Sequence, residues 1–316
     1  PGTAFESFSY DLSAYEGQNI RVVFYIATTY QFYMYIDNVV VDTVPTSSWT
    51  GAVDSDYNNA SNWSPTNVPD ASYNVTIPDV ANAPIISGST NASVNDLTIT
   101  EPDGIIINSG GTLIVNGTSS GNITYNRYLA TTNWYLMSSP VVGETYDDAY
   151  VTANSIASGI QNTNLRGIAP YNTFSNTWDY MQAGEAATFS AGTGYSVKRS
   201  SEGDISFTGT LNTADVSVGS LSTLGNRFNL IGNPYTSHIA SVTFLNNEAA
   251  ISDTKTLWVW NQATGSDGAY EVKIVDDALF LAPTQGFFVK ANATGDTTFN
   301  FAESNQESSG GTFQRT

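Results

Sequence analysis

The chain has 316 residues, with 29 Asp or Glu against 10 Lys or Arg, so its formal net charge is −19. A chain this acidic lacks the clustered basic residues that bind nucleic acid or an anionic membrane surface, and neither partner is expected. With no Cys and one His, it has no thiol nucleophile, disulfide framework or structural zinc site. No window approaches the roughly 18 consecutive apolar residues of a spanning helix, so membrane insertion is not expected.

Short runs that alternate between apolar and polar residues recur along the chain, separated by Asn-Gly, Gly-Gly and Ser/Thr/Asn clusters. A helical stripe of apolar residues is almost absent. This pattern predicts an all-β protein. The chain opens at Pro1 without an initiator Met or a signal-peptide pattern, and we interpret it as part of a longer protein.

The first predicted module covers residues 1–45, with strands at 20–26 and 32–41. So few strands cannot bury both faces of a sandwich, so we expect the end of a domain that begins upstream. Segments 10–18 and 35–39 resemble the closing half of the cleaved-adhesin/MAM-like jelly roll of secreted Bacteroidota proteins. That resemblance implies a structural calcium ion with Asp37 as a ligand.

Residues 46–127 are predicted to form a turn-rich connector followed by a short β segment. Apolar runs begin at 97, 105, 113 and 123, in steps of 8, 8 and 10 residues. These steps fit either a small β-solenoid or a meander of hairpins. The segment resembles the short β-helix-like parts of the same class of secreted proteins.

A second calcium candidate lies in the connector, where Asp54, Asp56 and Asn58 have the D-x-D-x-N spacing of a calcium loop. A hand-type loop also needs Gly at position 6 and Glu at position 12, and these positions are Asn59 and Pro65. A looser calcium loop at Asp54 and Asp56 is therefore the remaining metal prediction, against the alternative of a solvated acidic turn.

An internal duplication dominates the rest of the chain. Residues 134–140 match 228–234 at an offset of 94, and 194–198 match 286–290 at an offset of 92. Further matches keep the same order: 169–172 with 258–261, and 203–207 with 295–299. We predict two β-sandwich repeats, 128–218 and 219–302, which form either two sandwiches or one pseudo-symmetric sandwich.

Residues 232–235 and 282–291 resemble segments that precede the C-terminal sorting domain of secreted Bacteroidota proteins. The resemblance implies a type IX secretion cargo at the cell surface, anchored through a C-terminal domain that is missing here. Residues 303–316 would then be a flexible linker.

Aromatic side chains are the natural platforms for sugars, because the apolar face of a pyranose packs on a flat ring. An alternative is that these rings are the core face of alternating strands. The six candidates are Tyr30, Tyr33, Trp178, Tyr180, Trp260 and Tyr270. Two threonines, Thr43 and Thr297, fit the Asp-Ser/Thr pattern that Bacteroidota glycosylate on oxygen.

Catalytic signatures are weak. Residues 117–121 match the letters of G-x-S-x-G but lack a following helix, and a lone His238 is more readily a structural residue. The acid pairs Asp147/Asp148 and Asp276/Asp277 are sequence neighbours, which point to opposite faces of a strand.

Three hypotheses follow. The first is a non-catalytic part of a secreted adhesin-like protein, serving as scaffold and contacting glycans or a surface. The second is the accessory region of an exported peptidase or polysaccharide-degrading enzyme whose catalytic domain lies upstream. The third is a β-helix lyase, which the short solenoid, with no Lys and only Arg127 nearby, does not favour.

Overall fold

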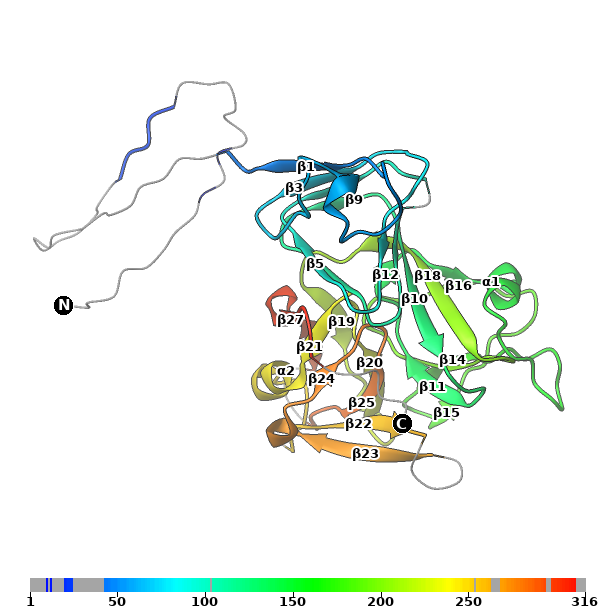
Figure 1. Ribbon diagram of the computed structural model, residues 1–316. Helices are drawn as coiled ribbons and strands as arrows, with labels where there is room; N and C mark the ends of the chain where they lie inside the picture. The colour runs from blue at the N-terminus through cyan, green and yellow to red at the C-terminus, as the bar shows by residue number, and fades with distance from the viewer. Residues whose placement is uncertain are drawn as a thin grey trace, which may run out of the picture. The chain divides into compact units, whose positions relative to one another are not determined.

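The computed structural model describes residues 10, 12, 20–24, 43–102, 104–252, 254–262, 268–293 and 297–310. Residues 44–316 form one compact unit and residues 1–43 another. The first unit contains the predicted jelly-roll end, which lies almost wholly outside the described residues. The second unit is all-β, as the sequence predicts, and its sheets are drawn in Figure 1.

The first part of the compact unit is a short parallel β-solenoid. Its strands stack in three parallel sets, β1-β3-β6-β9, β4-β7-β10 and β5-β8. The strands are β1 (Thr46–Trp49), β3 (Asn74–Ile77), β4 (Ile85–Ile86), β5 (Asn91–Val94), β6 (Leu97–Ile99), β7 (Ile105–Ile107), β8 (Thr112–Val115), β9 (Ser119–Ser120) and β10 (Ile123–Leu129). Parallel pairing rules out the meander of hairpins.

One turn of the solenoid is much longer than the steps seen in the sequence. Val75 pairs with Leu97 and Leu97 with Ser119, so the period is 97 − 75 = 22 and 119 − 97 = 22 residues. The predicted steps of 8 to 10 residues therefore separate successive sides of one turn. Gly104 makes a tight corner, because its φ is +67° and an added Cβ would lie 2.1 Å from the Asn122 carbonyl oxygen.

Inward-facing side chains form in-register apolar stacks inside the solenoid. Val75 lies beside Leu97, and Ile86 beside Ile107. An aromatic cap of Trp49, Tyr57 and Trp63 continues this core, with ring centroids 5.0 Å apart. The turn-rich connector is thus the end cap of the solenoid. β2 (Trp63–Ser64) completes it by pairing with β1.

The duplicated region contains the same nine elements twice, in the same order. In both copies four antiparallel strands form one sheet, ordered β11-β17-β14-β15 and β20-β25-β22-β23. Repeat 1 consists of β10, β11 (Trp134–Met137), β13 (Thr145–Tyr146), α1 (Asp148–Ala153), β14 (Ile168–Asn172), β15 (Thr177–Trp178), β16 (Ala187–Thr188), β17 (Tyr195–Lys198) and β18 (Gly203–Leu211). Repeat 2 consists of β19 (Val216–Ser220), β20 (Phe228–Gly232), β21 (His238–Ala240), α2 (Ser241–Asn247), β22 (Thr256–Asn261), β23 (Ala269–Ile274), β24 (Phe280–Leu281), β25 (Gly286–Lys290) and β26 (Thr298–Phe301).

The remaining strand pairs are duplicated as well. β13 pairs with β16 as β21 pairs with β24, and β10 pairs with β18 as β19 pairs with β26, all antiparallel. A short strand of repeat 1, β12 (Val141–Val142), lies at the outer edge of β18. Each repeat is therefore a four-stranded sheet backed by two further strand pairs and a short helix.

Two strands cross the predicted module boundaries. β10 is both the last solenoid strand and the first strand of repeat 1, so the boundary between 127 and 128 falls inside it. The boundary between 218 and 219 falls inside β19. The solenoid and repeat 1 share a continuous sheet, β12-β18-β10-β7-β4.

The prediction of a flexible linker from residue 303 is wrong for residues 303–310. β27 (Gln306–Glu307) pairs with β21, and the Thr112 hydroxyl of the solenoid donates to the Ser308 carbonyl oxygen at 2.8 Å. Backbone pairing and a buried acceptor fix this segment, which composition alone cannot reveal. Among the described residues, no helix has the length and apolar character needed to cross a bilayer.

Candidate functional site

The two repeats meet through symmetrical backbone contacts. Ser138 N–H donates to the Thr284 carbonyl oxygen at 3.0 Å, and Gly232 N–H donates to that of Gly192 at 2.9 Å. Ser138 corresponds to Gly232, and Gly192 to Thr284, at the offsets of 94 and 92 found in the sequence. Each repeat therefore presents the same surface to the other, as in a two-fold symmetric dimer.

This symmetry explains the glycine of the repeated Gly-aromatic-x-Val-Lys motif. An added Cβ at Gly286 would lie 2.7 Å from the Met137 backbone nitrogen, and one at Gly194 would lie 2.8 Å from the Ile231 carbonyl oxygen. Each glycine lets the strand of the other repeat pass directly over it.

An apolar layer, which we call the inter-repeat cluster, fills the space between the four-stranded sheets. Its best-buried members are Leu136, Leu230 and Phe288. Partly buried aromatic residues surround them: Tyr171, Trp178, Phe228, Trp258 and Trp260. The sheets thus have one face on their own core and one face on this shared layer, which combines the two arrangements predicted for the repeats.

Three of the predicted sugar platforms lie in or against this layer. Trp178 crosses Tyr171 with a centroid distance of 5.3 Å, and the equivalent pair in repeat 2, Trp260 and Tyr270, is 4.8 Å apart. Phe288 lies against both pairs, 4.9 Å from Tyr171 and 5.6 Å from Tyr270. These rings pack the repeats together, although Tyr270 remains 45% exposed.

The fourth described candidate, Tyr180, lies apart from that cluster. Its ring is 5.6 Å from that of Trp134, and the Lys198 Nζ lies 5.6 Å from the Trp134 ring centroid. The Gln262 amide donates to the Trp134 carbonyl oxygen at 2.7 Å. We call these residues the Trp134–Tyr180 patch; both rings are partly exposed.

Sequence reasoning missed Trp134, which it used only to align the repeats. The signal was present in that alignment, because Trp134 faces Lys198 across two strands as Phe228 faces Lys290. In repeat 2 the Lys290 Nζ lies 5.5 Å from the Phe228 ring. An aromatic residue opposite a Lys in both copies indicates a duplicated cation–π contact.

The Asp54 carboxylate is occupied by protein donors. It accepts from the Asn62 amide at 2.6 Å, from the Asp56 N–H at 2.9 Å and from the Asn59 amide at 3.1 Å. These bonds, the one from Asn62 foremost, lower the pKa of Asp54. Asp56 instead accepts from the Asn58 N–H. The described residues contain no group of three or more His, Cys, Asp or Glu side chains that could hold a metal ion.

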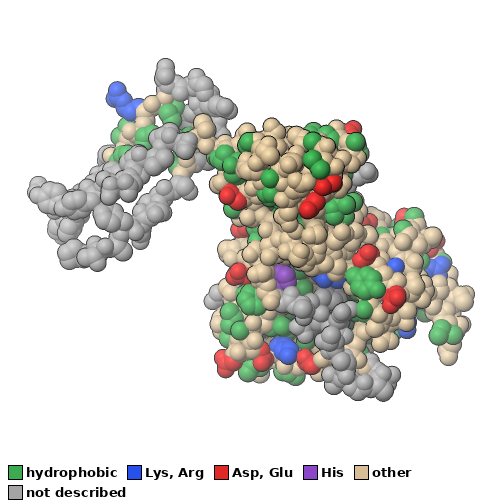
Figure 2. All heavy atoms as spheres, in the orientation of Figure 1, with side chains coloured by type: hydrophobic (Ala, Val, Ile, Leu, Met, Phe, Trp, Pro, Cys, Tyr) green, Lys and Arg blue, Asp and Glu red, His purple; other side chains and the backbone are tan. Residues whose placement is uncertain are grey.

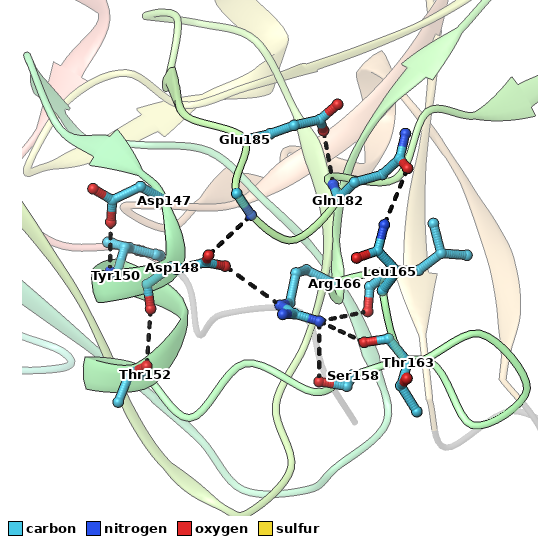
Figure 3. Close-up of polar contacts among 12 residues, drawn as sticks. Asp147, Asp148, Tyr150, Thr152, Ser158, Thr163, Leu165, Arg166, Gln182 and Glu185 are labelled. Carbon is cyan, nitrogen blue, oxygen red and sulfur yellow. Dashed lines mark hydrogen bonds and ion pairs between the residues drawn. The ribbon is translucent and has the colours of Figure 1, made fainter.

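The acids around α1 form a local network rather than a paired catalytic site (Figure 3). Asp147 caps the helix by accepting from the Tyr150 N–H at 2.8 Å. Asp148 turns the other way, 3.7 Å from the Arg166 guanidinium, and accepts from the Gly184 N–H. In repeat 2, Asp277 accepts from the Ile274 N–H and closes a turn in the same manner.

One carboxylate near this network is partly withdrawn from water. Glu144 accepts from the Thr208 N–H on β18, and burial raises the pKa of its carboxyl group above the ordinary value. Asp147 adds a smaller effect in the same direction. Glu144 also accepts from the Thr145 N–H beside it, so it holds β13 and β18 together.

The remaining motif residues are built into the fold. Residues 117–121 form the corner between β8 and β9, and His238 is a buried residue of β21. Arg127 is buried; it donates to the Thr284 hydroxyl at 3.0 Å and to the Pro283 carbonyl oxygen at 2.6 Å. It joins the solenoid to repeat 2 instead of lining a groove.

Several predicted residues lie elsewhere. Asp37, Tyr30 and Tyr33 are outside the described residues. Thr43 is exposed, and Thr297 is partly exposed, with its carbonyl oxygen accepting from the Leu221 N–H. The structure does not bring either threonine to the Trp134–Tyr180 patch.

Comparison with known proteins gives one match. Residues 48–119, the solenoid from β1 to β9, match a family model described as a domain of unknown function, DUF8693. No curated protein and no solved structure matches the chain.

Proposed function

We propose that this chain is a non-catalytic scaffold region of a secreted, adhesin-like surface protein, and that it contacts glycans through the Trp134–Tyr180 patch. The observation that carries this proposal is the pair of partly exposed rings beside Lys198, outside the cluster that joins the repeats. The type IX secretion route, the outer surface as location and a structural calcium ion belong to the same proposal through the resemblance described above.

The way the described acids are used supports a non-catalytic role. Asp54, Asp147 and Asp277 each bind a backbone N–H in a turn or helix cap, and Asp148 binds Arg166. Hydrolysis of a glycosidic bond needs two acids that flank one cleft. Carboxylates committed to separate turns do not provide that arrangement.

The chemistry of the patch suits a neutral or acidic sugar. The apolar face of a pyranose packs on a flat aromatic ring with little loss of side-chain entropy. Lys198, held over Trp134, offers an ammonium group to a hydroxyl or carboxylate of the same sugar. The net charge of −19 makes nonspecific binding of a polyanion unfavourable, so recognition would depend on this local geometry.

The fold supports the scaffold part of the proposal. β10 is shared by the solenoid and repeat 1, Arg127 links the solenoid to repeat 2, and the inter-repeat cluster joins the repeats. A continuous body of this kind holds a surface patch in a fixed position, which lowers the entropy cost of binding.

A glycan array probed with the 316-residue chain, with calcium and with a chelator, tests this proposal. We expect binding that Tyr180→Ala abolishes and that Phe174→Ala leaves unchanged, because Phe174 is 70% exposed and outside the patch. Loss of binding in the chelator would support the calcium part. A folded chain that binds no glycan would refute the glycan contact and leave a spacer role.

A further inference from the structure

The outer strand of repeat 2 presents an apolar edge that repeat 1 lacks. β23 is the last strand of its sheet, and its Tyr270, Val272 and Ile274 are 45%, 56% and 45% exposed. Figure 1 draws β23 along the lower margin of the unit, and in Figure 2 hydrophobic, acidic and basic side chains lie together there. The equivalent strand β15 has two residues against six in β23. Long, apolar, open edges pair with other strands unless something blocks them.

The backbone of this edge is able to form a ladder. Ile274 N–H donates to the Asp277 carboxylate at 2.7 Å, so it points away from β22. Backbone groups of alternate residues point the same way along a strand. The N–H groups of Tyr270 and Val272 therefore also point away from β22, toward the open side.

The sequence of β23 is complementary to itself when read in the opposite direction. In an antiparallel pair centred on Val272, Tyr270 lies opposite Ile274 of the second copy, and Glu271 lies opposite its Lys273. Glu271 and Lys273 already form an ion pair of 3.2 Å within one strand, on the face opposite the apolar side chains. Shifting the centre by one residue places Glu271 against Glu271 or Lys273 against Lys273, and like charges directly opposite destabilise a sheet.

We infer that β23 is a self-association edge, at which a second copy of this chain pairs its own β23 antiparallel about Val272. The two four-stranded sheets then become one continuous sheet across a two-fold axis. Apolar side chains of both copies cover each other on one face, and alternating Glu and Lys line the other. This inference goes beyond the proposed function and does not depend on glycan binding.

A cysteine at the two-fold axis tests the register directly. The chain has no Cys, and residues directly opposite in an antiparallel pair have Cβ atoms close enough for a disulfide. We expect Val272→Cys to form a disulfide-linked dimer in air that a reductant separates. Val142→Cys, in the edge strand β12 and 44% exposed, is the matched control and should stay monomeric. Equal crosslinking of both variants, or none, overturns the proposal.

Charge exchange tests the same edge without a covalent bond. Sedimentation equilibrium should show a dimer whose association weakens at least roughly tenfold in Glu271→Lys and in Lys273→Glu, since each puts like charges opposite one another. The double variant Glu271→Lys/Lys273→Glu restores complementarity and should recover the dimer. A chain that is monomeric at the highest soluble concentration, or a double variant no better than the singles, contradicts the inference.

Discussion

Repeat 1 and repeat 2 share one fold but differ in how their sheets end. At the surface where they meet, the copies match in detail: Gly194 and Gly286 lie under a strand of the other repeat, and Lys198 and Lys290 lie over an aromatic ring. At the outer edge they diverge, with two residues in β15 against six in β23. Positions buried between the copies are therefore constrained by both, whereas each outer edge is free to acquire its own role.

The connectors also show this division. Helix α1 is followed by 14 residues before β14, from 154 to 167, whereas eight residues separate α2 from β22, from 248 to 255. The extra residues of repeat 1 carry the loop around Arg166, which Asp148 holds in place. The small drift in offset between the repeated motifs reflects these loops, while the strand order stays the same.

The largest predicted effect is at the centre of the inter-repeat cluster. Phe288→Ala should lower the free energy of unfolding by about 3–5 kcal/mol, because it removes a buried ring that both repeats contact. Chemical denaturation measures this change. Phe174→Ala is the control and should stay within roughly 0.5 kcal/mol of the unmodified chain. Similar losses for both variants would show that the ring at 288 does not join the repeats.

A smaller effect is predicted at the duplicated glycine. Gly286→Ala places a methyl group against the backbone of β11 and should destabilise the chain by about 1–3 kcal/mol. Gly194→Ala should cost less, because its closest neighbour is the side chain of Leu230, which can move. Thermal unfolding of both variants measures the order. A neutral Gly286→Ala would contradict the close crossing of the strands.

The pH dependence of stability should separate repeat 1 from repeat 2. Burial raises the folded-state pKa of Glu144 above its ordinary 4.5, so its contribution to stability is fully present below that value and is lost as pH rises through the raised pKa. Glu144→Gln cannot ionise and should lack this loss, so its stability relative to the unmodified chain should increase toward neutral pH. Denaturation at a series of pH values tests this, and a constant difference would exclude burial of the carboxyl group.

The smallest effect concerns an Asn–acid pair that occurs in both repeats. Asn261 donates to Glu271 at 2.5 Å and Asn172 to Asp179 at 3.3 Å, across equivalent hairpins. The bond from Asn261, more than the one from Lys273, lowers the pKa of Glu271. Asn261→Ala should therefore raise the pKa of Glu271 toward its ordinary value, measured by NMR titration. Asn172→Ala should leave it unchanged, and a shift there would contradict the local cause.

The sequence was sufficient to find the duplication, because the motifs that mark it are strand positions fixed by contacts with the other copy. It predicted the all-β class and the parallel solenoid as one of two options. It could not give the 22-residue turn, because alternation is local and reports strands without saying which strands stack.

The candidate site was less predictable. Trp178, Trp260 and Tyr270 alternate with core residues on their strands, and nothing local tells whether the outer face meets water or another sheet. Asp54 has calcium-loop spacing, but the amide donors of Asn59 and Asn62 reach it only once the solenoid cap has folded. Residues 303–310 look like a linker because their partners, β21 and Thr112, lie far away in sequence.

The packing of one repeat against the other is tested most directly by a double-mutant cycle across the inter-repeat cluster. Tyr171 in repeat 1 and Phe288 in repeat 2 meet edge to face, with centroids 4.9 Å apart. The cycle of Tyr171→Ala and Phe288→Ala should give a coupling free energy of about 0.5–1.5 kcal/mol. Strictly additive effects of the two substitutions would show that the rings do not touch, and would contradict the symmetrical association of the repeats.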